Sequence, residues 1–212
     1  MSEYFSNYLK AIENPPFKLR KTFESEVELL KKFMDSNSDV LDVGCGAGRP
    51  AATLASEVNK IVAIDISERM LAAAKKKVAG VENVEVRHMD AFSMNFPDNK
   101  FDLVYATYNL IGSLSADKRG RLVKEMARVV KNDGIIITIT WKTGKNTTDF
   151  LRDYYPSIGI EVEDISAEEV VTSKGKFARV SENEMESLYR NAGLVSEFRD
   201  VGPLWKAAVG GK

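Results

Sequence analysis

Short apolar runs alternate with amphipathic helical patterns from residue 39 to residue 141, and this alternation limits the fold more than any other feature of the chain. The runs cover residues 39–43, 60–64, 84–87, 101–106 and 134–141, and the helical patterns cover 50–57, 67–78 and 116–130. Strands that alternate with helices in this way pair in parallel through right-handed crossovers. The sequence therefore predicts an α/β fold built on a doubly wound sheet with helices on both faces.

The segment before this core has a helical pattern. Residues 1–36 are expected to form a helical cap that the Pro-Pro pair within 14–17 divides into two pieces, because a helix rarely continues through two prolines. The spacing predicts an apolar stripe on the second piece, formed by Phe23, Val27, Leu30 and Met34.

The segment after the core departs from the strand-helix rhythm. Residues 142–180 are expected to form an insertion or lid, irregular apart from a helical piece near 147–155. Residues 181–212 predict a closing helix followed by two strands that pair antiparallel. We expect a single domain over residues 1–212, in which residues 37–141 are the ligand-binding core.

Composition excludes several classes of function. Hydrophobic residues make up 44% of the chain, charged residues 29%, and the net charge is −1, which weighs against a nucleic acid partner. One cysteine and one histidine rule out a disulfide within the chain and a multi-histidine or multi-cysteine metal site, so no metal is expected. No apolar run reaches the length of a membrane span. We expect a cytoplasmic protein without a membrane partner, and the sequence leaves its oligomeric state open.

A glycine-rich loop, Asp42 to Pro50 (DVGCGAGRP), follows the first predicted strand. Gly44, Gly46 and Gly48 allow a ligand to approach the backbone, and by themselves they leave dinucleotides, phosphates and nucleosides open as ligands. The spacing G-x-G-x-x-G of dinucleotide sites is not met, and Pro50 removes an N–H group that a phosphate would need. Asp65 and Asp90 end the second and third strands, and a carboxylate at the end of the second strand can accept from ribose hydroxyls. Together these features favour a nucleoside without phosphates.

At this point the sequence resembles a known family, the class I S-adenosylmethionine-dependent methyltransferases. VLDVGCGAG, AIDIS and HMDAF are similar to the first three motifs of that family, and FDLVYATYNLIGSL and LVKEMARVVKNDGIIIT to later ones. The resemblance runs from about Val40 to Trp141. It implies a Rossmann-like, mostly parallel sheet of seven strands with an antiparallel last strand, S-adenosylmethionine as cofactor, and methyl transfer as activity.

The resemblance also implies roles for particular residues. Gly44, Cys45 and Gly46 would present backbone to the methionyl part of the cofactor, and Asp65 would hold the ribose hydroxyls. The adenine would lie among Ile66, Met70, Asp90, Ala91 and Phe92, and the segment containing Ala106 would lie beneath the sulfonium. Asp42 is expected to organise the loop rather than to bind directly. Cys45 has no adjacent base in the sequence, so we expect a small structural residue rather than a nucleophile.

The methyl acceptor is expected to meet the residues that follow the fourth strand. Tyr108 and Asn109 are the candidates for positioning it, and the alternative for Asn109 is that it caps the following turn. The fourth motif is not the N-P-P-Y type that acts on nucleobase or amide nitrogens, so we expect a small-molecule acceptor. An RNA or protein methyltransferase on the same core, and a non-catalytic module that binds S-adenosylmethionine, are the alternatives.

Aromatic residues in the two covering segments are a further candidate feature of the site. Two readings stay open for them, plain core packing and a cage that closes around a neutral or cationic acceptor; they are Tyr4, Phe5, Tyr8, Phe17, Trp141, Tyr154 and Tyr155. The acidic run from Glu161 to Glu169 is either a solvated face or, if it faces the site, a feature that favours amines.

Overall fold

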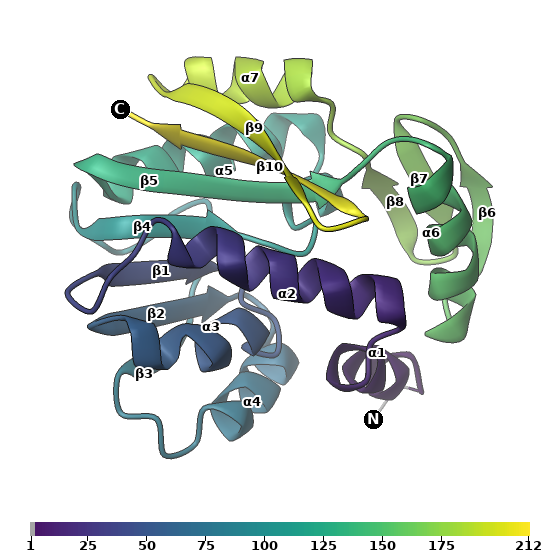
Figure 1. Ribbon diagram of the computed structural model, residues 1–212, viewed down its shortest axis with the longest axis horizontal. Coiled ribbons are helices and arrows are strands. Elements are labelled where there is room, and N and C mark those ends of the chain that lie inside the picture. The colour runs from purple at the N-terminus through teal and green to yellow at the C-terminus, as the bar shows by residue number, and fades with distance from the viewer. Residues whose placement is uncertain (1–2) are drawn as a thin grey trace.

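The computed structural model describes residues 3–212, with only the backbone given for residues 3–5, and it contains a seven-stranded sheet with helices on both faces (Figure 1). The strand order is β3-β2-β1-β4-β5-β10-β9. Strands β1 to β5 all run in parallel, whereas β10 pairs antiparallel with both β5 and β9. The predicted α/β, doubly wound sheet with an antiparallel last strand is confirmed.

The elements of the sheet and its covering helices begin and end close to the predicted positions. The strands are β1 (Asp39–Val43), β2 (Lys60–Asp65), β3 (Val84–His88), β4 (Phe101–Ala106), β5 (Val130–Trp141), β9 (Val195–Val201) and β10 (Trp205–Gly211). The helices are α1 (Glu3–Glu13), α2 (Phe17–Lys31), α3 (Arg49–Leu54), α4 (Glu68–Lys77), α5 (Ala116–Val129), α6 (Lys145–Ser157) and α7 (Glu182–Arg190), with single 3-10 turns η1 (Ala55–Glu57) and η2 (Ile111–Ser113). The break between α1 and α2 falls at the Pro-Pro pair, as predicted.

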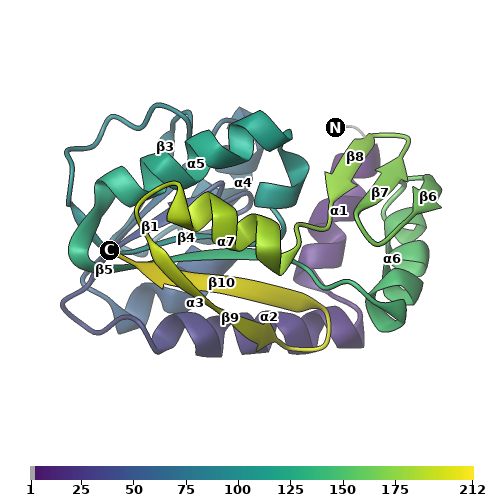
Figure 2. The same cartoon turned by 90° about the horizontal axis from the view of Figure 1, so that it is seen from above.

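The two faces of the sheet are covered by different helices (Figure 2). Apolar side chains of α2, α3 and α4 pack on one face, against inward residues such as Val40, Leu103 and Ile137. Helices α5 and α7 pack on the other face, against residues such as Leu41 and Val104. Buried strands with both faces covered are typical of parallel sheets and explain the near-continuous apolar runs in the sequence.

The buried face of α2 differs from the predicted stripe. Phe23 and Leu30 are buried as expected, but Val27 is only partly buried, and Met34 lies beyond the end of the helix. The buried side chains are Leu19, Thr22, Phe23, Glu26, Leu29 and Leu30. Val27 and Met34 still pack against the core, so the stripe is confirmed in part; the prediction missed Thr22 and Glu26 because it used apolar residues alone.

The lid segment, residues 142–180, is more regular than predicted. After α6, three short strands form a separate antiparallel sheet: β6 (Val162–Ile165), β7 (Glu169–Thr172) and β8 (Gly175–Ala178). Figure 1 shows α1, α6 and this small sheet together on the right, beyond the carboxyl ends of β4 and β5. Ligands of doubly wound sheets bind at that end, so the lid segment covers the expected site.

Candidate functional site

A pocket of about 340 Å³ lies at the carboxyl ends of the parallel strands. The glycine-rich loop after β1 and the start of the β2–α4 connection form one part of its wall. The turn after β4, the end of β5, α1, α6 and Phe177 of β8 form the other part. The volume is within the range of small-molecule sites. The pocket therefore joins the predicted cofactor loop to the segments predicted to meet an acceptor.

The glycine-rich loop turns sharply through left-handed backbone conformations. Gly46 has φ +53°, and a Cβ atom at this residue would meet nothing within 4 Å, so the loop presents open space there. Gly44 has φ +66°, and a Cβ atom would lie 2.5 Å from a methyl group of Leu110. The first position allows a ligand to approach the backbone, and the second requires glycine for packing. The loop fits the predicted role of Gly44, Cys45 and Gly46, which all line the pocket.

Asp65, at the end of β2, is fixed by two backbone hydrogen bonds. Its Oδ2 accepts from the Gly46 N–H at 2.9 Å, and its Oδ1 accepts from the Ser67 N–H at 2.8 Å. A carboxylate oxygen has two lone pairs, so each oxygen can accept one more hydrogen bond. The side chain lines the pocket beside the glycine-rich loop. This geometry fits the predicted role of Asp65 in holding two neighbouring hydroxyls of a ribose.

The residues predicted to surround the adenine divide into two groups. Met70 lines the pocket, whereas Ile66, Asp90, Ala91 and Phe92 lie outside its wall. The side chain of Ile66 is 63% exposed, which is unusual for a large apolar residue and leaves a surface on which a flat ring can pack. Asp90 is exposed and accepts from the Phe92 N–H at 2.8 Å. Of the predicted adenine contacts outside the pocket wall, Ile66 and Asp90 are thus exposed, whereas Ala91 and Phe92 are half-buried.

Ala106 lies at the end of β4 and is fully buried. It does not line the pocket, whereas the next residue, Thr107, does. Of the segment predicted to lie beneath the sulfonium, Thr107 is therefore the residue that reaches the cavity.

Replacement of Asp65 by alanine is expected to weaken the binding of S-adenosylhomocysteine by about 1.5–3 kcal/mol, the range for hydrogen bonds to a charged group. Isothermal titration calorimetry measures this loss directly. Glu82→Ala is the matched control, because Glu82 is exposed and precedes β3 at the opposite end of the sheet. Equal affinities for wild type and Asp65→Ala would remove Asp65 from the ribose role.

A buried ion pair lies behind the glycine-rich loop. The Arg49 guanidinium donates to Glu26 of α2, and the Arg49 side chain also stacks over the Phe23 ring, with Cζ 3.8 Å from the ring centre. The Glu26 side chain is fully buried, and that of Arg49 is 15% exposed. Burial raises the pKa of Glu26, and Arg49 offsets part of this rise. The pair ties α2 to the loop, and Arg49 lines the pocket.

Asp42 is buried beneath the loop, close to Glu26 and Arg49. Burial raises its pKa to about 8, and the nearby Tyr105 hydroxyl opposes this rise. Neither carboxylate oxygen of Asp42 has a hydrogen-bond partner of ordinary geometry. Asp42 does not line the pocket. Its position fits the expectation that it organises the loop.

Cys45 is buried in the loop and lines the pocket. Burial raises the pKa of its thiol, and the negative charges of Asp42 and Asp65 raise it further. A nucleophilic cysteine needs the opposite environment, one that favours the thiolate. The surroundings of Cys45 fit the predicted structural role.

Tyr108 and Asn109 follow β4 with left-handed backbone, at φ +52° and φ +59°. Residues other than glycine adopt this conformation at a cost, and such strain clusters at binding and active sites. Both side chains line the pocket. Their roles in positioning an acceptor stay predictions, with this geometry in their favour.

The Asn109 side chain is also part of the framework. Its Oδ1 accepts from Thr140 of β5 at 2.9 Å, and its Nδ2 donates to the Ala178 carbonyl of β8 at 3.4 Å. The residue therefore connects the end of β4 to β5 and to the lid segment. The sequence alternative placed Asn109 as a turn cap, and the observed side-chain partners are in β5 and β8 instead.

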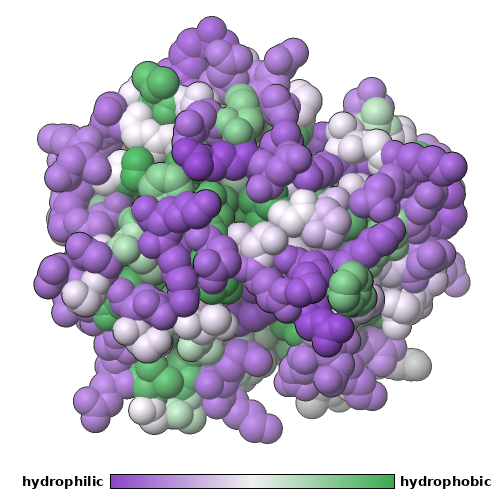
Figure 3. Space-filling view, viewed as in Figure 1, coloured by the Kyte–Doolittle hydropathy of each residue, from purple (hydrophilic) through white to green (hydrophobic). Residues whose placement is uncertain are grey.

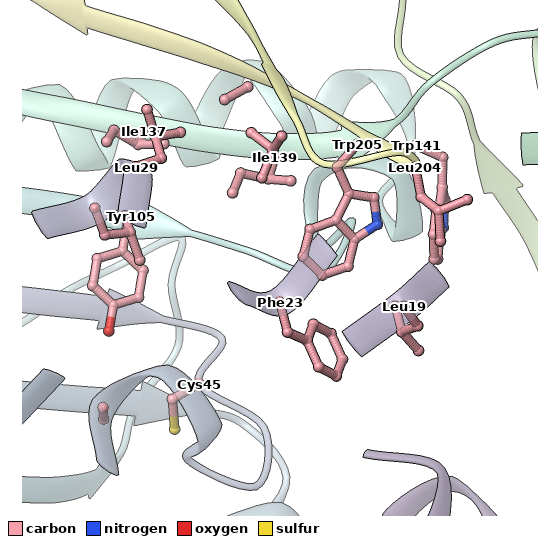
Figure 4. Packing of buried hydrophobic residues seen from close by; sticks show 14 of the residues in the cluster. Leu19, Phe23, Leu29, Cys45, Tyr105, Ile137, Ile139, Trp141, Leu204 and Trp205 are labelled. Carbon is pink, nitrogen blue, oxygen red and sulfur yellow. The ribbon is translucent and has the colours of Figure 1, made fainter. Parts of the chain in front are cut away.

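Tyr108 contacts aromatic residues from five elements. Its hydroxyl lies 2.5 Å from that of Tyr154, and its ring lies 5.6 to 6.2 Å from those of Tyr8, Phe23, Trp141 and Trp205. Figure 4 shows Trp205 with Phe23 and Trp141 next to it, beneath β5 and β10. The ring contacts join the cap, the sheet and the lid segment at one point of the pocket wall.

Of the aromatic residues for which core packing and a cage were both open, Trp141, Tyr154 and Tyr155 belong to the buried core, and Tyr8 packs against it. Tyr8, Trp141, Tyr154 and Tyr155 line the pocket, and Phe17 is 65% exposed and lies outside its wall. The side chains of Tyr4 and Phe5 lie outside the described residues. Sequence reasoning missed pocket residues in the cap and the lid segment, namely Ile12, Ile158, Ile160 and Phe177. The Ser-Lys-Gly turn at 173–175 was a signal for the hairpin that carries Phe177.

The sequence of the chain is similar to those of known methyltransferases. Residues 40–134 match the family described as "Methyltransferase domain". The chain is 30% identical over 142 residues to a demethylmenaquinone methyltransferase of Staphylococcus saprophyticus, an alignment that covers 66% of this chain and 58% of the relative. The chain thus spans little more than half the length of that curated relative.

Solved structures extend the likeness to nearly the whole chain. The protein PH0226 of Pyrococcus horikoshii is 26% identical with a TM-score of 0.70, over 93% of this chain and 92% of that one. A methyltransferase of Aquifex aeolicus described as dependent on S-adenosylmethionine has the same fold, with 24% identity, a TM-score of 0.69 and coverage of 95% and 96%. Residues 40–134 thus form a methyltransferase domain of the class I type, whose methyl donor is S-adenosylmethionine.

Proposed function

We propose that the protein transfers a methyl group from S-adenosylmethionine to a small-molecule acceptor. One observation carries this proposal: the glycine-rich loop with Asp65 and the aromatic wall from α1, β5 and α6 line the same pocket. A donor held by the loop and an acceptor held by the wall would meet within it. In this proposal, residues 1–212 form one domain, in which residues 1–36 and 142–180 cover the core. The protein acts in the cytoplasm.

When bound, S-adenosylmethionine supplies a methyl group on a positively charged sulfur, which an acceptor lone pair takes while the C–S electrons stay on sulfur as a neutral thioether. The protein contributes orientation. The backbone of the loop and Asp65 fix the donor, and Tyr108 and Asn109, held in left-handed conformations, face the acceptor. Such positioning accounts for on the order of 7–11 kcal/mol of a barrier in well-aligned reactions.

None of the described residues that line the pocket is proposed to act as a general base. Asp65 is the carboxylate among the described residues that line the pocket, and two backbone N–H groups already hold it. Burial raises the pKa of Tyr108 well above its usual range, and the hydroxyls of Tyr154 and Tyr8 add to the rise, so the Tyr108 hydroxyl keeps its proton and does not act as a base. A proton lost by the acceptor would pass to water. Catalysis by positioning and desolvation follows from this arrangement.

A small molecule is a better acceptor for this site than a macromolecule. The net charge of −1 gives no electrostatic attraction for RNA, and the pocket volume of about 340 Å³ is within the range of small-molecule sites. The curated relatives are named as demethylmenaquinone methyltransferases, which act on a small molecule. No helix in the described part of the chain is long and apolar enough to cross a membrane.

The direct test is transfer of labelled methyl from S-adenosylmethionine to a panel of phenols, quinols, amines and carboxylates, with RNA and a peptide mixture as separate arms. Label is expected in a small-molecule arm, and Asp65→Ala should lower the rate at limiting cofactor. Label in RNA or peptide alone would assign a macromolecular acceptor. Cofactor binding without transfer to any arm would favour a non-catalytic module.

A further inference from the structure

The acceptor part of the pocket wall carries no charged side chain among the residues that the structure describes. The charged residues of the whole wall are Arg49 and Asp65; Arg49 is already paired with Glu26, and two backbone N–H groups hold Asp65. The acceptor part consists of aromatic, aliphatic, hydroxyl and amide groups, supplied by Tyr8, Ile12, Thr107, Tyr108, Asn109, Leu110, Ser113, Trp141, Tyr154, Tyr155, Ile158, Ile160 and Phe177. An ion placed here would lose its hydration without meeting a counter-ion, which is costly.

The acidic run of the lid segment does not supply that counter-ion. Glu161, Glu163 and Asp164 are exposed, and the run from Glu161 to Glu169 is outside the pocket wall. Figure 3 shows a largely hydrophilic surface at its right, over α6 and the small sheet. The acidic run thus lies outside the wall that the aromatic and aliphatic side chains of the lid segment form, so the run is a solvated face and gives no support for amine acceptors.

Cationic acceptors meet a second obstacle. Aromatic rings attract cations, but the methyl donor of this family is itself positively charged at the reacting sulfur, and like charges in a pocket of low polarity repel strongly. An ammonium ion also has no lone pair with which to attack. It would first need to lose a proton, and rings that stabilise the cation oppose that loss.

The wall has flat surfaces with one hydroxyl pair between them. Tyr155 stacks on Phe177, with ring centres 5.7 Å apart and an interplanar angle of 21°. Tyr8 and Trp141 present further rings around Tyr108. Rings of this kind pack well on other aromatic rings. The Tyr108–Tyr154 hydroxyl pair, at 2.5 Å, places two polar oxygens beside these rings.

We propose that the methyl acceptor is an uncharged, planar aromatic molecule with a hydroxyl or carbonyl group, packed on the lid rings and hydrogen-bonded to the Tyr108–Tyr154 pair. Apolar faces set the preference for a flat ring, and the hydroxyl pair sets the preference for an oxygen substituent. The inference rests on the proposed function, because it takes this part of the pocket as the place of the acceptor.

The test compares four probes that share one ring system: 1-naphthol, naphthalene, 1-naphthoate and 1-naphthylmethylammonium. Their dissociation constants are measured by fluorescence titration or calorimetry, with the protein free and saturated with S-adenosylhomocysteine. We expect 1-naphthol to bind at least roughly tenfold more tightly than either ion, which reflects the cost of burying an unpaired charge. Equal or tighter binding of an ion, or no binding of any probe, would overturn the inference.

Variants test the role of the hydroxyl pair. Tyr154→Phe should weaken 1-naphthol binding roughly 3- to 10-fold, the effect of one neutral hydrogen bond, and leave naphthalene binding unchanged. Lys176→Ala, at an exposed residue next to Phe177, is the control and should change neither. Equal losses for both probes in Tyr154→Phe would contradict the hydrogen bond.

The two proposals fail in different ways in these titrations. If S-adenosylhomocysteine does not bind, the proposed function fails, and the probe ranking on the free protein still decides the preference of the pocket. If it binds and an ion is preferred, only the acceptor class is wrong.

Discussion

Replacement of Asp42 by asparagine is expected to make the protein progressively more stable than the wild type as the pH rises from 5 to 7.5. Burial raises the pKa of Asp42 to about 8, against an ordinary value of 3.8. The carboxyl group therefore stays protonated in the folded protein across this window but ionises in the unfolded chain, so the wild type loses stability as the pH rises. The loss is up to about 1.4 kcal/mol per pH unit, or about 3 kcal/mol over the window.

Chemical denaturation of both proteins at several pH values measures this difference. Asparagine has nearly the same shape and does not ionise, so the two stabilities should converge toward pH 4 and separate toward pH 8. Parallel stability curves would show that Asp42 has an ordinary pKa and is not desolvated beneath the loop. Glu26 is present in both proteins, so its own contribution to the pH dependence of stability largely cancels in the comparison.

The second large effect is expected at the buried ion pair. Glu26→Ala should lower the free energy of unfolding by about 3 kcal/mol, because it leaves the Arg49 guanidinium without its carboxylate in the interior. The estimate is at the low end of the range for buried pairs because the Arg49 side chain is 15% exposed and keeps some contact with water. Urea denaturation at fixed pH measures the loss.

Two further variants separate the charge effect from loss of volume. Glu24→Ala, on the exposed side of the same helix, breaks an ion pair with Lys21 and should cost less than about 1 kcal/mol. The double variant Glu26→Leu with Arg49→Met replaces the pair by apolar groups and should recover much of the loss. If Glu26→Ala costs no more than Glu24→Ala, the pair does not stabilise the attachment of α2.

The central sheet could be predicted because its strands are buried on both faces. Runs such as 60–64 and 134–141 are then mostly apolar, and the helices between them keep a clear period. The glycine-rich loop and Asp65 follow from the same pattern, since the carboxyl ends of strands β1 and β2 meet at one edge. Local sequence was sufficient for these features.

The small sheet and the buried pair could not be predicted in the same way. Strands β6 and β8 have four residues each and no fully buried side chain, so their sequence resembles that of a solvated loop. Glu26 lies among charged residues of α2, and only the position of Arg49, far along the chain, explains why it faces inward. The glycine-rich motif predicts no role for Arg49, whereas in the structure this residue ties the loop to α2.

Calorimetric titration of the purified chain with S-adenosylhomocysteine, S-adenosylmethionine and NAD tests most directly whether the pocket binds a methyl donor. The geometry of the glycine-rich loop and Asp65 predicts saturable binding of the first two ligands and none of NAD. Binding of NAD, with no binding of either adenosyl compound, would contradict the assignment of this pocket to a methyl donor.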